Sequence, residues 1–165
     1  MKAGLGPWFP VAPHKFIVLS VFSFGIYDFF WVYQNWRRAQ QASGEDISPF
    51  WRTFLVVPIW IFPLLRRIER SNVATPERSN WKTDALGLAY VVFAFALLLP
   101  SAVGLVLAAG SFLPLVPAVR TIARVNAAAG NPEGVNDRYT IACVATIVVG
   151  GFIYAILIVA TILGF

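Results

Sequence analysis

Charged residues are scarce in this chain, which argues against a soluble fold. Only 13% of the 165 residues are Asp, Glu, Lys or Arg, whereas a soluble domain carries about 25%. Hydrophobic residues make up 58% of the chain, and several uncharged runs approach the length that crosses a bilayer. The composition therefore predicts a polytopic, all-helical membrane protein, with residues 1–165 forming a single membrane domain.

Cysteine and histidine each occur once, which limits the chemistry open to the chain. Cys143 alone excludes an intrachain disulfide and a cysteine-based metal site. His14 stands beside Lys15 just before the first apolar run, where a role at the membrane interface fits better than ligation. The sequence also lacks phosphate-binding loops, zinc-protease motifs and paired intramembrane acids. We therefore expect no enzymatic activity, no metal and no cofactor.

Acidic residues are fewer than basic ones, 8 against 13, so the net charge is +5. The basic residues border apolar runs and form no groove-entering motif, which favours anionic lipid headgroups over nucleic acid as a partner. Three clusters form a candidate face for binding lipid or a partner: Arg37, Arg38, Arg66, Arg67, Arg70, Arg120 and Arg124. The same arginines also fit a plain topological signal, because basic residues collect in cytoplasmic loops.

The apolar runs and their borders predict five helices, at about residues 16–36, 49–70, 84–107, 112–127 and 139–163. The first would be about 31 Å long, which is one hydrocarbon thickness. Ser48 and Pro49 favour the start of the second, since the hydroxyl can cap free N–H groups and proline suits the first turn. The apolar part of that helix, between Arg52 and Arg66, is short for a crossing.

Residues 85–119 carry no charge and are too many for one crossing. They fit a helical hairpin that turns either at residues 100–101 or at residues 108–111. If the helix at 49–70 lies at the interface, the chain crosses four times; if it crosses, there are five crossings. The distribution of Lys and Arg barely separates these layouts. We predict four crossings because the second helix is short.

One motif occurs twice in the chain. The pattern P-x-x-R-x-I-x-R-x-N occupies residues 63–72 and again residues 117–126, an offset of 54 residues. A duplicated two-helix unit would explain the match. The alternative is that membrane helices ending on the basic side commonly end in arginine.

Asp28 lies inside the first apolar run and is the costliest residue there. An ionised carboxylate in hydrocarbon costs about 3 kcal/mol on insertion scales, so it must face protein or water, or carry a proton. Asn35 lies two turns further along the same predicted helix face. Asp28 and Asn35 together form the candidate intramembrane polar site, which would suit a proton or a cation. The alternative is a structural ion pair with Arg52 or another basic residue.

Small residues recur every four positions in the last predicted helix. Ala142, Thr146 and Gly150 form one such stripe, and Gly151 and Ala155 form another. Such stripes let two helices approach closely. They would serve packing within the bundle or a homo-oligomer.

Residues 23–36, S-F-G-I-Y-D-F-F-W-V-Y-Q-N-W, resemble the opening motif of a group of small bacterial membrane proteins. In that motif (T/S)-x-G-x-Y is followed by W-x-Y-x-N-W, and S-P-F-W-R at residues 48–52 fits its continuation. The resemblance places the chain near the family called domain of unknown function 4234 and covers about residues 13–67. It implies a bacterial inner-membrane location, and it carries no activity or substrate with it.

Together these observations predict a non-enzymatic, multi-pass inner-membrane protein. It would act by association with anionic lipid or with membrane proteins, including further copies of itself. The alternative is a small proton- or cation-coupled transporter or channel component that uses Asp28.

Overall fold

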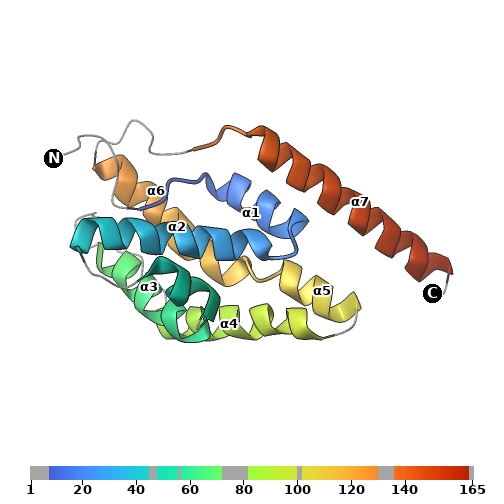
Figure 1. The fold of residues 1–165 in the computed structure, drawn as a ribbon, viewed down its shortest axis with the longest axis horizontal. Helices are drawn as coiled ribbons and strands as arrows, with labels where there is room; N and C mark the ends of the chain where they lie inside the picture. The colour runs from blue at the N-terminus through green and yellow to red at the C-terminus, as the bar shows by residue number, and fades with distance from the viewer. Residues whose placement is uncertain are drawn as a thin grey trace.

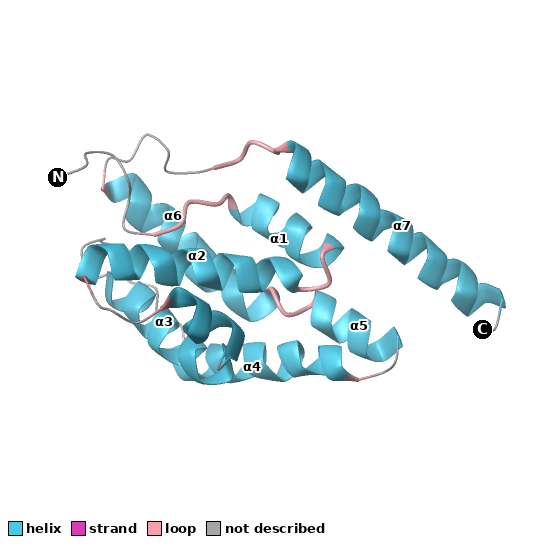
Figure 2. Cartoon of the chain, viewed as in Figure 1, coloured by secondary structure: helices cyan, strands magenta, loops and turns pink. Residues whose placement is uncertain are grey.

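The computed structural model describes residues 8–44, 48–55, 57–71, 82–99, 102–129 and 136–163, and this part contains helices and loops but no strand (Figure 2). The α-helices are α1 (Pro13–Phe22), α2 (Ile26–Ser43), α3 (Val57–Ser71), α4 (Thr83–Phe95), α5 (Ala102–Ala109), α6 (Val116–Ala128) and α7 (Ile141–Leu163). Shorter elements are the π-helical turn η1 (Trp51–Leu55) and the 3-10 turns η3 (Ala96–Leu98) and η4 (Leu113–Leu115). The described residues therefore confirm the all-helical class, but they form seven α-helices instead of the five predicted.

The helices α1 to α6 form a bundle, and α7 packs on its α1 side (Figure 1). α3 packs against both α4 and α6, and α1 contacts α2, α5, α6 and α7. The described residues of the two motif copies lie in α3 and α6, and equivalent positions in and just before them are buried. Pairs offset by 54 residues are fully buried: Ile61 and Leu115, Leu64 and Ala118, Leu65 and Val119, Ile68 and Ile122. The segments around the motif therefore bury matching apolar positions, whereas the motif's own arginines are exposed in both copies.

The first predicted helix, residues 16–36, is not one helix, so this prediction was wrong. α1 ends at Phe22, and α2 returns antiparallel beside it (Figure 1). The rings of Phe16 and Trp31 lie 5.5 Å apart, whereas a straight helix would separate these residues by about 22 Å. The segment therefore enters and leaves the bundle at the same end.

The reversal between α1 and α2 depends on the backbone of Phe24 and Gly25. Their φ angles are 52° and 82°, which lie in the left-handed region and end a right-handed helix. Gly25 is also confined by its neighbours. A Cβ atom at this position would lie 2.6 Å from Ser111 Oγ and 2.8 Å from the carbonyl oxygen of Ala108. Hydropathy reveals neither the positive φ angles nor the close contacts of Gly25. The apolar run is therefore predicted to form one helix.

The uncharged stretch 85–119 forms a hairpin with a second interruption in its returning arm. α4 continues through η3, the chain reverses before Ala102, and α5 packs back on η3. Residues 100–101, one predicted turn position, lie outside the described residues. The other predicted position, 108–111, interrupts the returning arm between α5 and η4 without reversing it.

The remaining predicted boundaries also differ in detail. The predicted helix 84–107 is divided among α4, η3 and α5, because the chain reverses within it. The predicted helix 112–127 corresponds to η4 and α6, and 139–163 to α7. Helical structure begins at Pro49 and continues through η1 and α3 to Ser71, with residue 56 outside the described residues.

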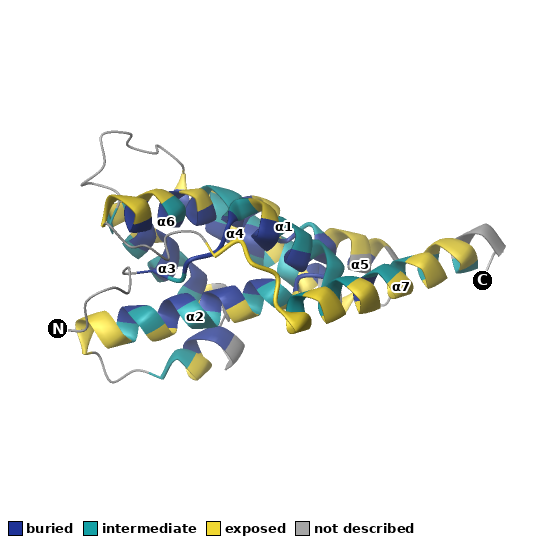
Figure 3. Cartoon of the chain, turned by 90° about the horizontal axis from the view of Figure 1, so that it is seen from above, coloured by how far each residue is buried: buried dark blue, intermediate teal, exposed yellow. Residues whose placement is uncertain are grey.

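Two stretches of the described residues are long and apolar enough to cross a membrane. They are Val106–Ala128, which is half buried, and Ile141–Ala160, which is almost entirely exposed. The exposed part of α7 extends beyond the other helices (Figure 3). Further exposed apolar side chains lie on α4, η3 and α5: Leu88, Val92, Phe95, Leu98, Val103 and Val106. Exposed apolar side chains in this number support a membrane environment.

Candidate functional site

The helix segments that carry the three arginine clusters meet around Trp8. Its Nε1 donates to Ser71 Oγ at the end of α3 over 2.9 Å. Its backbone N–H donates to Asn126 Oδ1 of α6 (3.4 Å), and Asn126 Nδ2 donates to the carbonyl oxygen of Trp8 (3.1 Å). The same carbonyl accepts from Arg38 Nη1 of α2 at 2.8 Å. The C-terminal parts of α2, α3 and α6 therefore lie at one end of the bundle.

We call the seven arginines of these clusters the basic end. Five of them are exposed and two are partly buried. Arg67, one of the partly buried pair, lies over the ring of Trp36 at 5.5 Å. The exposed guanidinium groups come from three different helices, so the basic end is a surface that these helices share.

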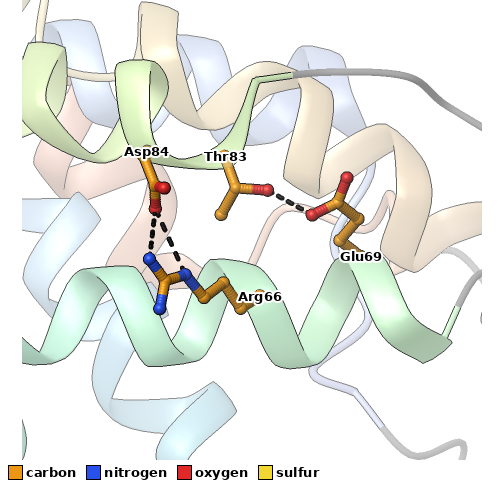
Figure 4. Close-up of polar contacts among 4 residues, drawn as sticks. All are labelled: Arg66, Glu69, Thr83 and Asp84. Atoms are coloured by element: carbon orange, nitrogen blue, oxygen red, sulfur yellow. Dashed lines mark hydrogen bonds and ion pairs between the residues drawn. The ribbon is translucent and has the colours of Figure 1, made fainter.

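A shallow cavity of about 390 Å³ opens between α3 and α4 at this end, lined by Arg66, Glu69, Arg70, Lys82, Thr83 and Asp84. Arg66 donates twice to Asp84 Oδ1, at 3.2 and 2.8 Å, and Thr83 Oγ1 donates to Glu69 (Figure 4). Within the described ranges, Arg70 and Lys82 pair with no acid. The two carboxylates already accept hydrogen bonds from their neighbours, so these two cations face solvent.

Asp28 is fully buried between two interruptions of the helices. Ser20 Oγ, on α1 just before the α1–α2 turn, donates to Asp28 Oδ1 over 2.5 Å. Ser111 Oγ, between α5 and η4, donates to Asp28 Oδ2 over 2.5 Å. In the part of the chain that the structure describes, no basic side chain pairs with this carboxylate.

The alternative ion pair between Asp28 and Arg52 does not form. The Arg52 guanidinium lies 4.3 Å from the ring centre of Trp36 and 4.9 Å from that of Trp60. Cation–π contact with two indole rings accounts for the burial of this arginine. Among the described residues, Asp28 is thus held by neutral hydroxyl groups, without a counter-charge.

Asn35 does not join Asp28, although both side chains are fully buried. Asn35 Oδ1 accepts from the Phe9 N–H at 3.1 Å, and its Nδ2 donates to the Trp31 carbonyl oxygen at 2.9 Å. Asn35 therefore fixes the segment that precedes α1. The two members of the candidate polar site have separate roles.

Sequence reasoning missed the roles of Trp8 and Ser111. Asn126, the last residue of the second motif copy, could have pointed to the contact with Trp8, because a buried asparagine side chain requires a hydrogen-bond partner. Ser111 gave no such signal in an uncharged run. Across the described ranges, no group of three His, Cys, Asp or Glu side chains could hold a metal ion.

The small-residue stripe of α7 is used for contact within the chain. A Cβ at Gly150 would lie only 1.9 Å from the carbonyl oxygen of Phe22, so α7 and α1 touch through their backbones here. Tyr154 donates to the Val21 carbonyl oxygen at 3.1 Å and stacks on Phe24. Intramolecular packing therefore accounts for Gly150.

No family model matches the chain, and no curated protein or solved structure shows significant similarity to it. The resemblance of residues 13–67 to domain of unknown function 4234 stays a prediction.

Proposed function

We propose that this is a non-enzymatic, multi-pass membrane protein whose basic end binds the anionic surface of the membrane. The observation that carries the proposal is the meeting of three arginine clusters around Trp8. Arginines from α2, α3 and α6 thereby share one surface. Juxtamembrane basic clusters of this size are attracted to anionic headgroups.

The distribution of charge along the bundle supports this orientation. The α1–α2 turn, η3, α5 and α7 lie away from the basic end (Figure 1). Their described residues carry no charge, and their apolar side chains are largely exposed. A bundle that is basic at one end and apolar at the other fits insertion through the apolar end.

This orientation removes one crossing, that of residues 16–36, from the predicted four-crossing layout. α7 has 23 residues and is about 34 Å long, enough to cross the hydrocarbon layer. The α1–α2 hairpin enters and returns on the basic side and contributes no crossing. The segment before α1 and the end of α7 then lie on opposite sides. The resemblance to bacterial membrane proteins and the excess of arginine support an inner membrane with the basic end in the cytoplasm.

The test uses vesicles that contain brominated lipids, which quench tryptophan fluorescence on contact. We expect stronger quenching by brominated phosphatidylglycerol than by brominated phosphatidylcholine. The variant R37Q/R70Q/R120Q removes one exposed arginine from each of α2, α3 and α6. At about 1 kcal/mol for each basic residue, the relative affinity for the anionic lipid falls about a hundredfold.

The matched control is R37K/R70K/R120K, which keeps the three charges and should keep the preference. Equal quenching by the two lipids in the unmodified protein would contradict the proposal. So would an unchanged preference in the glutamine variant. In that case the basic end is a surface for a membrane-protein partner or only a topological signal.

One observation favours a second candidate function. Asp28 is buried with two hydroxyl donors, and no described basic side chain supplies a counter-charge. A small proton- or cation-coupled transporter or channel component would require such a group. Its direct test is the loss of ion-dependent flux in proteoliposomes on D28N, with lipid preference unchanged.

A further inference from the structure

We propose that Asp28 is a proton-binding site that couples the α1–α2 turn to the interruption between α5 and α6. The proposal is independent of lipid binding by the basic end, and it deepens the second candidate function by naming the ion. The proposal rests on one geometric observation. The buried carboxylate of Asp28 accepts a hydrogen bond from Ser20, in the α1–α2 hairpin, and another from Ser111, between α5 and η4.

The absence of a counter-charge among the described residues makes a permanently ionised Asp28 costly. Burial of an unpaired carboxylate is normally relieved by protonation or by an added positive charge. The basic residues on the packed helices point elsewhere. Lys15 of α1 donates to Asn136 Oδ1 and to the carbonyl oxygen of Arg138, and Arg120 of α6 is exposed. A proton is the remaining source of compensation.

The hydrogen bonds favour a proton over a metal cation. Both serine hydroxyls direct their hydrogens at the carboxylate oxygens, each over 2.5 Å. A metal ion would instead need the oxygen lone pairs of these hydroxyls to point at it, with the hydrogens turned away.

Two tyrosines are also near this carboxylate. The charge of Tyr27 on α2 and that of Tyr90 on α4 would interact with that of Asp28. α4 packs against η4, which directly follows the Ser111 interruption. The Tyr90 hydroxyl is fully buried and has no hydrogen-bond partner in the described part of the chain.

Proton binding changes the hydrogen-bond pattern without any other bond forming or breaking. The carboxylate takes a proton from solvent and becomes a carboxylic acid, whose O–H is a donor. One of the two serine hydroxyls must then accept instead of donate, and its own hydrogen turns to another acceptor. Because Ser20 and Ser111 belong to different hairpins, the proton alters the contact that joins them.

The experiment is infrared spectroscopy of the full chain in vesicles over a range of pH. We expect the carbonyl stretch of a buried carboxylic acid that persists above about pH 5, where exposed carboxyl groups are ionised, its loss as pH rises further, and its absence in D28N. The control D84N removes an exposed carboxylate and should keep the band. A band that D28N does not remove, or that no pH abolishes, would overturn the proposal. Loss of the band on adding Na⁺ at fixed pH would also overturn it, in favour of a metal cation.

Two further variants keep the acid and serve if D28N does not fold. S20A and S111A each remove one donor to the carboxylate, so the pH at which the band is lost should rise by about one unit. The variant R37Q/R70Q/R120Q should leave this pH unchanged, which separates the proton site from lipid binding. An unchanged pH in both serine variants would refute the proposed site.

Discussion

Ser111 Oγ donates a hydrogen bond to Asp28 Oδ2 over 2.5 Å, across 83 positions of the chain. Ser111 lies in the interrupted arm of one hairpin, and Asp28 begins the returning arm of the other. Both residues are buried. A contact of this kind joins the two hairpins at a polar point inside an otherwise apolar bundle.

Replacement of Ser111 by alanine should therefore destabilise the folded protein. A hydrogen bond to a charged group contributes about 1.5 to 3 kcal/mol, and the loss of its donor leaves a buried carboxylate oxygen unsatisfied. We expect a decrease of this size in the free energy of unfolding, measured by denaturation in detergent. Thr146→Ala is the control, because Thr146 Oγ1 bonds only within its own helix, to the Ala142 carbonyl oxygen. Equal effects of the two variants would show that the Ser111 bond contributes little.

Gly25→Ala should destabilise the protein more than Gly44→Ala. Both glycines have positive φ, 82° and 69°, so each alanine incurs about 1 kcal/mol of backbone strain. A Cβ at Gly25 also collides with Ser111 Oγ and the Ala108 carbonyl oxygen, whereas nothing lies within 4 Å of one at Gly44. Overpacking adds about 1 to 3 kcal/mol at Gly25 only. Thermal unfolding of the two variants measures the difference, and identical melting temperatures would contradict the close approach.

Gly150→Ala should weaken the packing of α7 on α1. The new methyl group would lie 1.9 Å from the Phe22 carbonyl oxygen, and a backbone atom is not free to move aside. We expect a cost of about 1 to 3 kcal/mol. At Gly151 the nearest atom is 3.6 Å away, on the Phe22 ring, so Gly151→Ala should be neutral or stabilising through helix propensity. A destabilising effect at Gly151 that equals the one at Gly150 would place a different face of α7 against α1.

His14 and Gln41 should lie on the same side of the membrane. Both are exposed, His14 in the first turn of α1 and Gln41 in the last turn of α2. Single cysteines at these positions, in a Cys143→Ser background, should react alike with a membrane-impermeant maleimide in intact cells. Labelling of one and protection of the other would mean that residues 16–36 cross the bilayer as one helix.

Trp8 and Ser71 should be energetically coupled. Trp8→Phe keeps most of the buried ring but removes the Nε1 donor to Ser71 Oγ. A double-mutant cycle with Ser71→Ala should give a coupling energy of about 0.5 to 1.5 kcal/mol, the usual contribution of a neutral hydrogen bond. The measurement compares unfolding free energies of the two single variants and the double variant. Strict additivity would show that this bond does not help hold the segment before α1.

Some features of this protein follow from local sequence alone. Composition predicts an all-helical chain, which the described residues confirm, and the uncharged run at 139–163 locates α7. These properties depend on hydropathy, period and residue type over neighbouring positions.

Other features were decided only by the tertiary structure. The reversal at residues 23–25 requires two positive φ angles in an apolar run and close approach to Ser111, so hydropathy alone predicts one long helix. The partners of Asp28 and the position of Trp8 between α3 and α6 likewise involve residues 83 and 118 positions away. Sequence determined which residues are apolar, basic or costly to bury. Tertiary packing decided which of them meet, because contacts between distant segments depend on where the chain turns.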